Sequence, residues 1–143
     1  MSEPWILLRG LTRESRHWGA FATLLAARDG VLPIDLPGNG TAVHERSPLA
    51  VDDYVDTLRA QALRYGARPP YRVLAMSLGG MVATAWARAL RYPDEIGRLV
   101  LVNTSMRPFS RVDERLRPSA WAALVRVAQH WDGGDTGGIA ETL

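Results

Sequence analysis

The sequence predicts an α/β fold, with a mostly parallel sheet flanked by helices. Four short apolar runs alternate along the chain with segments of helical periodicity, which is the pattern of βαβ units joined by right-handed crossovers. At 143 residues and 47% hydrophobic content, the chain is long and apolar enough for one domain with a buried core. We divide it into a sheet-and-helix core at residues 1–105 and, at residues 106–143, the start of a lid, cap or C-terminal helical segment, which we expect to be truncated.

The predicted strands are short runs rich in aliphatic side chains, bounded by turn residues. They are Trp5–Leu8, Val31–Ile34, Tyr71–Ala75 and Leu99–Asn103. The last run is apolar at every position from Leu99 to Val102, which is typical of a strand buried on both faces. We therefore expect it to lie inside a sheet, and to form a long apolar edge if its neighbours are missing.

Helical periodicity appears in three segments between the strands, which are Ser15–Arg28, Val51–Tyr65 and Leu78–Tyr92. In the first, Trp18, Phe21 and Leu24 recur at helical spacing and are expected to face the core. Pro93 ends the third, because proline cannot continue a helix. A polar, arginine-rich stretch then precedes a further amphipathic segment at Ser119–Trp131, which we interpret as the helix of a lid or cap.

Composition excludes several classes of function. The net charge is only +2 and the 17 basic residues are scattered, so we expect no nucleic-acid partner. The absence of cysteine excludes disulfides and Cys-based metal sites. We see no run long enough for a membrane span and no signal peptide at the start, so we expect a cytoplasmic protein without a membrane partner. Asp132 and Asp135 lie among glycines but lack the spacing of a cation loop, so no metal or cofactor is expected.

The turn around Ser77 is the most informative motif in the chain. A strand-like run ends at Met76, and a predicted helix begins directly after Ser77, which is the layout of a nucleophile elbow. Small residues are required two positions before and after the serine of such a turn, and Ala75 and Gly79 occupy those positions. The alternative is an ordinary strand–helix junction at which the serine caps the helix.

Four segments, taken together, resemble the α/β-hydrolase superfamily, in its serine-nucleophile branch. They are Leu7–Leu11, Ile34–Gly40, the elbow at Ser77 and Tyr92–Asn103. The resemblance covers roughly residues 5–105. It implies that the four strands correspond to the third to sixth of an eight-stranded sheet, so that this is a partial α/β-hydrolase fold. The second strand would then pair with one side of the first and the third with the other side, and ligand crevices form where strand order reverses in this way.

The resemblance also implies roles for particular residues near Ser77. Ser77 would be the catalytic nucleophile, and the backbone N–H groups of Leu11 and Leu78 would form the oxyanion hole. Gly10 would let the chain turn sharply and aim the Leu11 amide inward. Arg9 departs from the family's usual histidine, and this arginine could either pair with an acid or point outward.

The general base and the acid of a triad are not found in this pattern. In the family an acid and then a histidine follow the serine, but His17, His44 and His130 do not follow a seventh or eighth strand. No carboxylate stands at Asn103–Ser105, where some members carry the acid. His17 remains open as a substitute base, although a solvated histidine at a helix end is the favoured interpretation. Asp35, which precedes a Pro-Gly turn, is expected to be structural.

We therefore expect a serine-dependent hydrolase that acts on a carboxylic ester, thioester or amide through an acyl-enzyme. Its partner would be a small-molecule acyl substrate. Because the triad is incomplete, we expect the chain to be the N-terminal half of a longer hydrolase and to be inactive alone. The alternative is a non-catalytic or degenerate half-domain that associates with itself or a partner through the exposed edge strand at Leu99–Asn103, since unprotected edges promote pairing.

Overall fold

The computed structural model describes residues 3–105, 111, 114, 121–122 and 125–126 of the chain. The chain divides into two compact units, Met1–Thr104 and Ser105–Leu143, and the sheet with its helices belongs to the first. In the second unit, the described residues 121–122 and 125–126 are helical. The rest of the predicted Ser119–Trp131 helix, together with His130, Asp132 and Asp135, lies outside the described residues. The assignment of residues 106–143 to a lid or cap stays a prediction.

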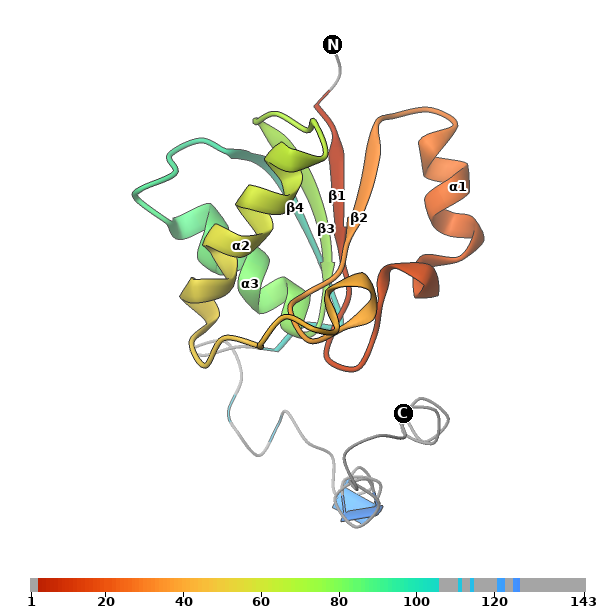
Figure 1. The fold of residues 1–143 in the computed structure, drawn as a ribbon, viewed down its shortest axis with the longest axis vertical. Helices are drawn as coiled ribbons and strands as arrows, with labels where there is room; N and C mark the ends of the chain where they lie inside the picture. The colour runs from red at the N-terminus through yellow and green to blue at the C-terminus, as the bar shows by residue number, and fades with distance from the viewer. Residues whose placement is uncertain (1–2, 106–110, 112–113, 115–120, 123–124, 127–143) are drawn as a thin grey trace. The chain divides into compact units, whose positions relative to one another are not determined.

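Four parallel strands form the sheet and confirm the predicted fold class. They are β1 (Trp5–Leu8), β2 (Val31–Ile34), β3 (Tyr71–Met76) and β4 (Ile96–Val102). Their order is β2-β1-β3-β4, and every pair is parallel. The second strand therefore lies on one side of the first and the third on the other, as expected. All four carboxyl ends point to the lower edge of the sheet in Figure 1, where the loops that carry the candidate site begin.

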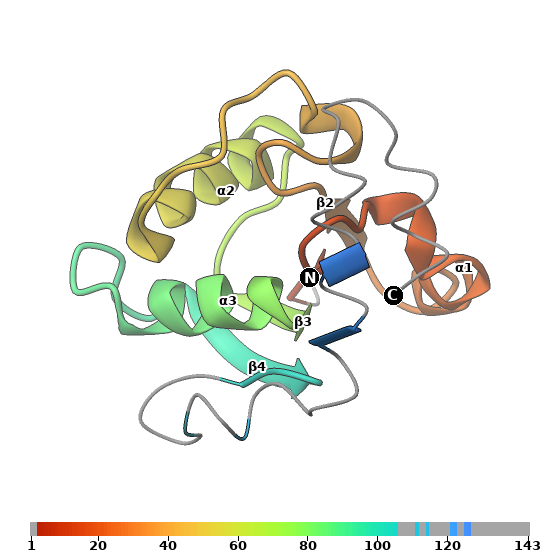
Figure 2. The ribbon, with the colours of Figure 1, turned by 90° about the horizontal axis from the view of Figure 1, so that it is seen from below.

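Helices cover both faces of this sheet, but unequally. They are the 3₁₀ turn η1 (Ser15–Trp18), α1 (Ala20–Ala26), the 3₁₀ turn η2 (Gly40–Ala42), α2 (Val51–Arg64) and α3 (Leu78–Arg88). Figure 2 shows α2 and α3 on one face and α1 on the other. Among the described residues, no helix has both the length and the apolar character that crossing a membrane requires.

The hydrophobic core lies between the sheet and the pair α2 and α3. Alternate residues of the strands, such as Ile6 and Val73, point toward these helices and are fully buried. Leu58 of α2 and Trp86 of α3 fill the space between them, and the ring of Trp86 packs 5.4 Å from that of Tyr71. Burial of this apolar surface is the main favourable contribution to folding.

The first predicted helix, Ser15–Arg28, is broken in the structure. Gly19 adopts φ +51°, which ends η1 and lets α1 begin in a new direction. Trp18 is buried as expected, but Phe21 is 46% and Leu24 70% exposed, so their predicted core positions are wrong. The reason is that α1 packs against β2, at the rim of a face that no other described helix covers.

Strand β4 is longer and more exposed than its sequence suggested. It begins at Ile96 rather than Leu99 and occupies an edge of the sheet. Val100 and Leu101 are 37% and 44% exposed. Among the described residues β4 has a strand on one side only, and α3 covers only one of its faces. It therefore forms the apolar edge expected if its neighbours are missing, and it is not buried on both faces.

A buried carboxylate joins the helical layer to the amino end of β4. Glu95 accepts a hydrogen bond from Arg59 Nε of α2 at 2.8 Å and another from the indole Nε1 of Trp86 in α3 at 3.0 Å. Its side chain is only 10% exposed, and Trp86 is fully buried. The carboxylate thus satisfies a buried donor and links three elements far from the carboxyl edge of the sheet.

Glu95→Ala is expected to lower the free energy of unfolding by about 2 kcal/mol, because the buried Trp86 indole N–H then loses its acceptor. Urea denaturation followed by circular dichroism measures this change. Arg91→Gln is the matched control. It breaks the ion pair between Asp56 of α2 and Arg91 in the connection from α3 to β4, and both of these side chains are about half exposed. Exposed pairs contribute little, so equal losses in the two variants would contradict the assignment.

Candidate active site

Ser77 sits at the tip of a strained turn between β3 and α3. Its backbone adopts φ +50° and ψ −121°, a conformation that is costly for any residue with a Cβ. The side chain is exposed, whereas Ala75 and Gly79 on either side are buried. Ser77 occupies the N-cap position of α3, yet its side chain forms no capping hydrogen bond. The elbow geometry expected from the motif is therefore present, and helix capping does not explain this serine.

Glycines allow the elbow to lie directly against the end of β1. A Cβ placed on Gly79 would lie 2.5 Å from the carbonyl oxygen of Arg9. A Cβ on Gly10 would lie 2.8 Å from Ser77 Cβ and 3.2 Å from Ser77 Oγ. Both contacts are closer than packed atoms allow, so only glycine fits at these two positions. The residues that follow β1 are thereby held beside the serine hydroxyl.

The loop after β1 opens with a turn over residues 10–13, which begins at Gly10. The amide of Arg13 donates to the carbonyl of Gly10 at 3.2 Å, and the positive φ of this turn, +59°, falls on Thr12 rather than on Gly10. Gly10 also allows the close approach to Ser77. Within the described residues, no backbone carbonyl accepts a hydrogen bond from the amides of Leu11 or Leu78. These two amides directly follow Gly10 and Ser77, which are in contact, and their role as oxyanion donors stays a prediction.

Asp35 organises the loops around this edge and has the structural role expected for it. Its buried carboxylate accepts hydrogen bonds from the Ser15 backbone amide and hydroxyl, the latter at 3.2 Å. It also accepts from the amide and hydroxyl of Thr41, at 2.8 and 2.9 Å. A single side chain thus ties the start of η1 to the turn after β2. No described contact joins Asp35 to Ser77.

The histidines are not brought to Ser77 in the described part of the chain. His17 Nδ1 accepts a hydrogen bond from the Glu14 amide at 3.0 Å, and its Nε2 lies 4.0 Å from the Glu14 carboxylate. His17 therefore stabilises the start of η1, and its use as a substitute base gains no support. His44 is exposed just after η2, and His130 lies outside the described residues.

The segment after β4 begins beside the serine. The Ser77 amide donates to the carbonyl of Val102 at 3.3 Å, so Asn103 follows directly at the same edge, with φ +47° and an exposed side chain. Thr104 packs its hydroxyl where a Cβ on Gly80 would lie. As the sequence indicated, no carboxylate stands at residues 103–105 to serve as the acid of a triad.

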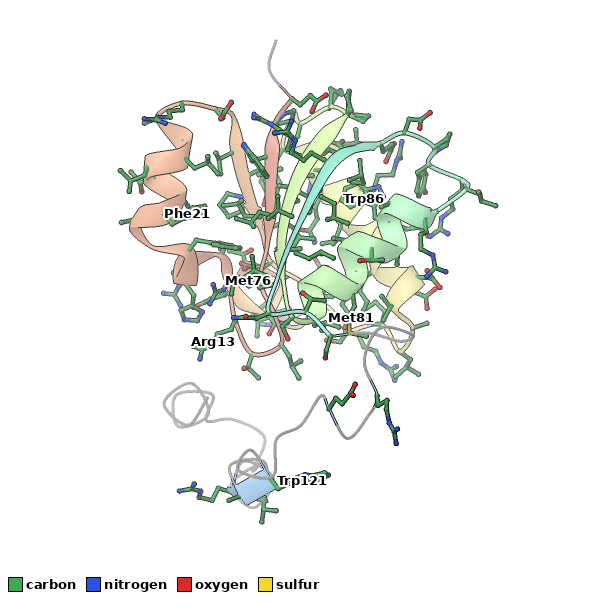
Figure 3. The ribbon with its side chains drawn as sticks, turned by 180° about the vertical axis from the view of Figure 1, so that it is seen from behind. Arg13, Phe21, Met76, Met81, Trp86 and Trp121 are labelled. Atoms are coloured by element: carbon green, nitrogen blue, oxygen red, sulfur yellow. The ribbon has the colours of Figure 1, made fainter. Side chains whose placement is uncertain are left out.

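Arg9 was expected either to pair with an acid or to point outward, and among the described residues it does neither. Its guanidinium stacks over the ring of Trp18 at 5.0 Å, and its Nη1 lies 3.1 Å from Met76 Sδ. Burial, followed by the nearby charge of Arg13, lowers the pKa of Arg9. Figure 3 shows Met76 and Arg13 at the same end of the sheet. Strand alternation could have placed Met76 on the face opposite the core, but nothing local indicated that Trp18 would lie under Arg9.

Comparison with known proteins agrees with this geometry. A model described as the alpha/beta hydrolase family matches residues 5–141, further along the chain than the residues 5–105 on which the resemblance rested. The chain is 38% identical over 120 residues to a pimeloyl-acyl-carrier-protein methyl ester esterase of Chromobacterium violaceum, covering 82% of this chain and 44% of that protein. It is 35% identical over 105 residues to a biotin biosynthesis bifunctional protein, BioHC, of Teredinibacter turnerae, covering 70% of this chain and 17% of that protein.

A solved structure shows the same relation in three dimensions. A malate-bound thermophilic esterase from Thermogutta terrifontis superimposes with a TM-score of 0.70 at 26% identity. The match covers 100% of this chain and 49% of that esterase. This chain thus spans less than half the length of the curated relatives that it matches and about half of this solved structure.

Proposed function

Because this chain belongs to the alpha/beta hydrolase family, we propose that it carries the nucleophile half of a serine-dependent hydrolase. The bond attacked is a carboxylic ester, a thioester or an amide. The exposed, strained turn at Ser77, with Gly10 packed against it, is the observation that carries this proposal. The names of the relatives, two of which are esterases, favour an ester among the three bonds.

In this proposal Ser77 Oγ attacks the carbonyl carbon of the substrate, and a general base takes the hydroxyl proton. The N–H groups of Leu11 and Leu78 stabilise the developing oxyanion, where each donor of this kind contributes about 3 kcal/mol in similar sites. The alcohol, thiol or amine leaves with a proton returned by the base. Water then hydrolyses the acyl-enzyme and regenerates Ser77. No cofactor takes part in this sequence of steps.

We further propose that the 143-residue chain does not turn over substrate by itself. Ser77 forms no hydrogen bond to a histidine or a carboxylate among the described residues. A serine hydroxyl without a base is a weak nucleophile. The acid and the base would then come from a polypeptide segment that completes the fold, as the lengths of the relatives suggest.

The test joins residues 1–105 of this chain to the remaining C-terminal portion of the Chromobacterium esterase. The chimera is expected to hydrolyse a p-nitrophenyl ester and to gain a single fluorophosphonate adduct by intact mass. Ser77→Ala should remove both signals and leave the circular dichroism spectrum unchanged. Undiminished turnover in Ser77→Ala, or a folded chimera without an adduct, would end the proposal.

The unfused 143-residue chain is the second arm of this experiment. It is expected to give no adduct at Ser77 under the same conditions. An adduct that disappears in Ser77→Ala would show that this chain supplies its own base and would overturn the proposal of inactivity. Alanine replacement of His17, His44 and His130, one at a time, would then identify that base.

A non-catalytic role is a second candidate, and the exposed edge of β4 supports it. Val100 and Leu101 present apolar surface on a strand that has no further neighbour among the described residues, and such edges pair with other strands. A stable dimer in light scattering, together with a folded chimera that lacks Ser77 reactivity, would favour this candidate over the hydrolase. A monomeric chain would exclude self-association through β4.

A further inference from the structure

Two arginines, Arg72 in β3 and Arg9 directly after β1, each stack on the ring of a tryptophan at nearly the same distance. Arg72 lies 4.9 Å over the ring of Trp5, at the amino end of β1, and Arg9 lies 5.0 Å over the ring of Trp18, just beyond the carboxyl end of that strand. Stacking of this kind holds the planar guanidinium in a fixed orientation. The two stacks differ in what the guanidinium groups reach.

Arg72 has the hydrogen-bond acceptors that a guanidinium requires. Its Nη2 pairs with Asp29 Oδ1 at 2.7 Å, and its Nε donates to the carbonyl of Glu3 at 2.8 Å. The guanidinium of Arg72 is therefore satisfied, although the buried indole Nε1 of Trp5 has no partner among the described residues. Arg72 shows what the same arrangement looks like in this protein when it serves the fold alone.

Arg9 lacks such acceptors. Its Nη1 reaches only the weakly accepting sulfur of Met76, and its buried Nε has no partner. No carboxylate within the described residues forms an ion pair with it. The orphaned Arg9 Nε is the feature that separates the two stacks, because the indole Nε1 atoms of Trp18 and Trp5 are both buried without partners among the described residues. A buried donor that is left unsatisfied is costly, and each such group calls for an explanation.

Arg9 lies beside the candidate nucleophile. Arg9 directly precedes Gly10, which touches Ser77, and the carbonyl of Arg9 faces Gly79 of the elbow. Met76, which the guanidinium contacts, is the residue before Ser77. No carboxylate among the described residues pairs with the guanidinium, and burial together with the positive charge of Arg13 lowers the pKa of Arg9. The missing interaction at this point is therefore with an acceptor that carries negative charge.

We propose that Arg9, whose guanidinium is held against the ring of Trp18, forms a carboxylate-binding subsite next to Ser77. The ligand is an ester whose acyl or alcohol part carries a carboxylate. A guanidinium fork matches the two oxygens of such a group and binds it more strongly than a neutral acceptor. The assignment of an ester substrate rests on the proposed function, whereas carboxylate binding itself does not require turnover.

Nuclear magnetic resonance of the 15N-labelled 143-residue chain tests this subsite. The Arg9 Nε–Hε signal and the Trp18 indole signal are followed during titration with monomethyl succinate, and methyl butyrate serves as the neutral ester of similar size. Both signals are expected to shift with the half ester, which should bind about tenfold or more tightly than the neutral ester. Arg9→Gln should weaken binding of the half ester by a similar factor, and Arg72→Gln, the matched stack, should leave it unchanged.

The subsite is overturned if the neutral ester binds as tightly as the half ester, or if Arg72→Gln weakens binding as much as Arg9→Gln. Sodium acetate that binds as tightly as monomethyl succinate would overturn the assignment to ester substrates. Ser77→Ala is expected to retain the Arg9 shift. If the chimera shows Ser77 reactivity but Arg9 binds no carboxylate, the subsite alone fails. If Arg9 binds the half ester but Ser77 is never reactive, the hydrolase proposal alone fails.

Discussion

Gly79→Ala is expected to destabilise the fold by about 3 kcal/mol, at the upper end of the usual cost of overpacking a buried site. The added Cβ would lie 2.5 Å from the carbonyl oxygen of Arg9 and 3.0 Å from the carbonyl carbon of Leu8. Both are backbone atoms at the end of β1, a strand that is paired on both sides, so neither can move without disturbing the sheet. The effect opposes helix propensity, which would favour alanine over glycine by about 1 kcal/mol within α3.

The free energy of unfolding from urea denaturation measures this effect, and Gly30→Ala is its control. A Cβ on Gly30 would meet only Pro4 at an ordinary distance of 3.7 Å, so that variant should be neutral or slightly more stable. In the chimera, Gly79→Ala should also reduce the rate of fluorophosphonate labelling at Ser77, because the elbow must shift away from Gly10. A Gly79→Ala variant as stable as Gly30→Ala would mean that the contact between elbow and strand is looser than the structure shows.

The elements that the sequence predicted well are those fixed by local patterns. Each strand is a short apolar run between turn residues, and the turn at Ser77 needs small neighbours whose positions can be read directly. Strand order followed from the resemblance and agrees with the sheet. These features depend on neighbouring residues or on a motif with fixed spacing.

The features that the sequence did not predict depend on contacts between distant residues. The positive φ of Gly19 separates η1 from α1, and helical periodicity alone does not show this break. The exposure of Leu101 depends on whether another strand follows β4. The stack of Arg9 on Trp18 joins a strand end to a 3₁₀ turn. Periodicity reports which residues are apolar, but it does not report what covers them.

The sequence predicted the nucleophile of the candidate site but not the polar contacts around it. Ser77 and the nearby amides of Leu11 and Leu78 follow from the motif, and the structure brings the two segments together through Gly10 and Gly79. The unsatisfied donors around Arg9 could not be inferred, because burial and hydrogen bonding are properties of the folded chain. In the subsite that we propose, Arg9, which replaces the family's usual histidine, binds a carboxylate of the substrate.

Asp35→Ala is expected to lower the free energy of unfolding by about 3 kcal/mol. The buried carboxylate accepts bonds from two backbone amides and two hydroxyls, at Ser15 and Thr41, and bonds to a charged acceptor contribute about 1.5–3 kcal/mol each. Water that enters the space left by the side chain satisfies some of these donors, so the loss is less than their sum. Thermal and urea denaturation measure the change in stability.

The same substitution should also loosen the loop that carries Leu11. Hydrogen exchange is expected to speed up at the Ser15 and Thr41 amides before the rest of the sheet opens, because these amides lose their acceptor. Asp56→Ala is the control, since Asp56 pairs with Arg91 through a side chain that is 58% exposed and should cost about 1 kcal/mol or less. Equal losses in the two variants, or unchanged exchange at Ser15 and Thr41, would mean that Asp35 does not hold the two loops together. Faster exchange confined to those loops would mean that the Asp35 carboxylate holds in place the loop that carries the Leu11 amide. The same carboxylate would then support any stabilisation of an oxyanion at Ser77.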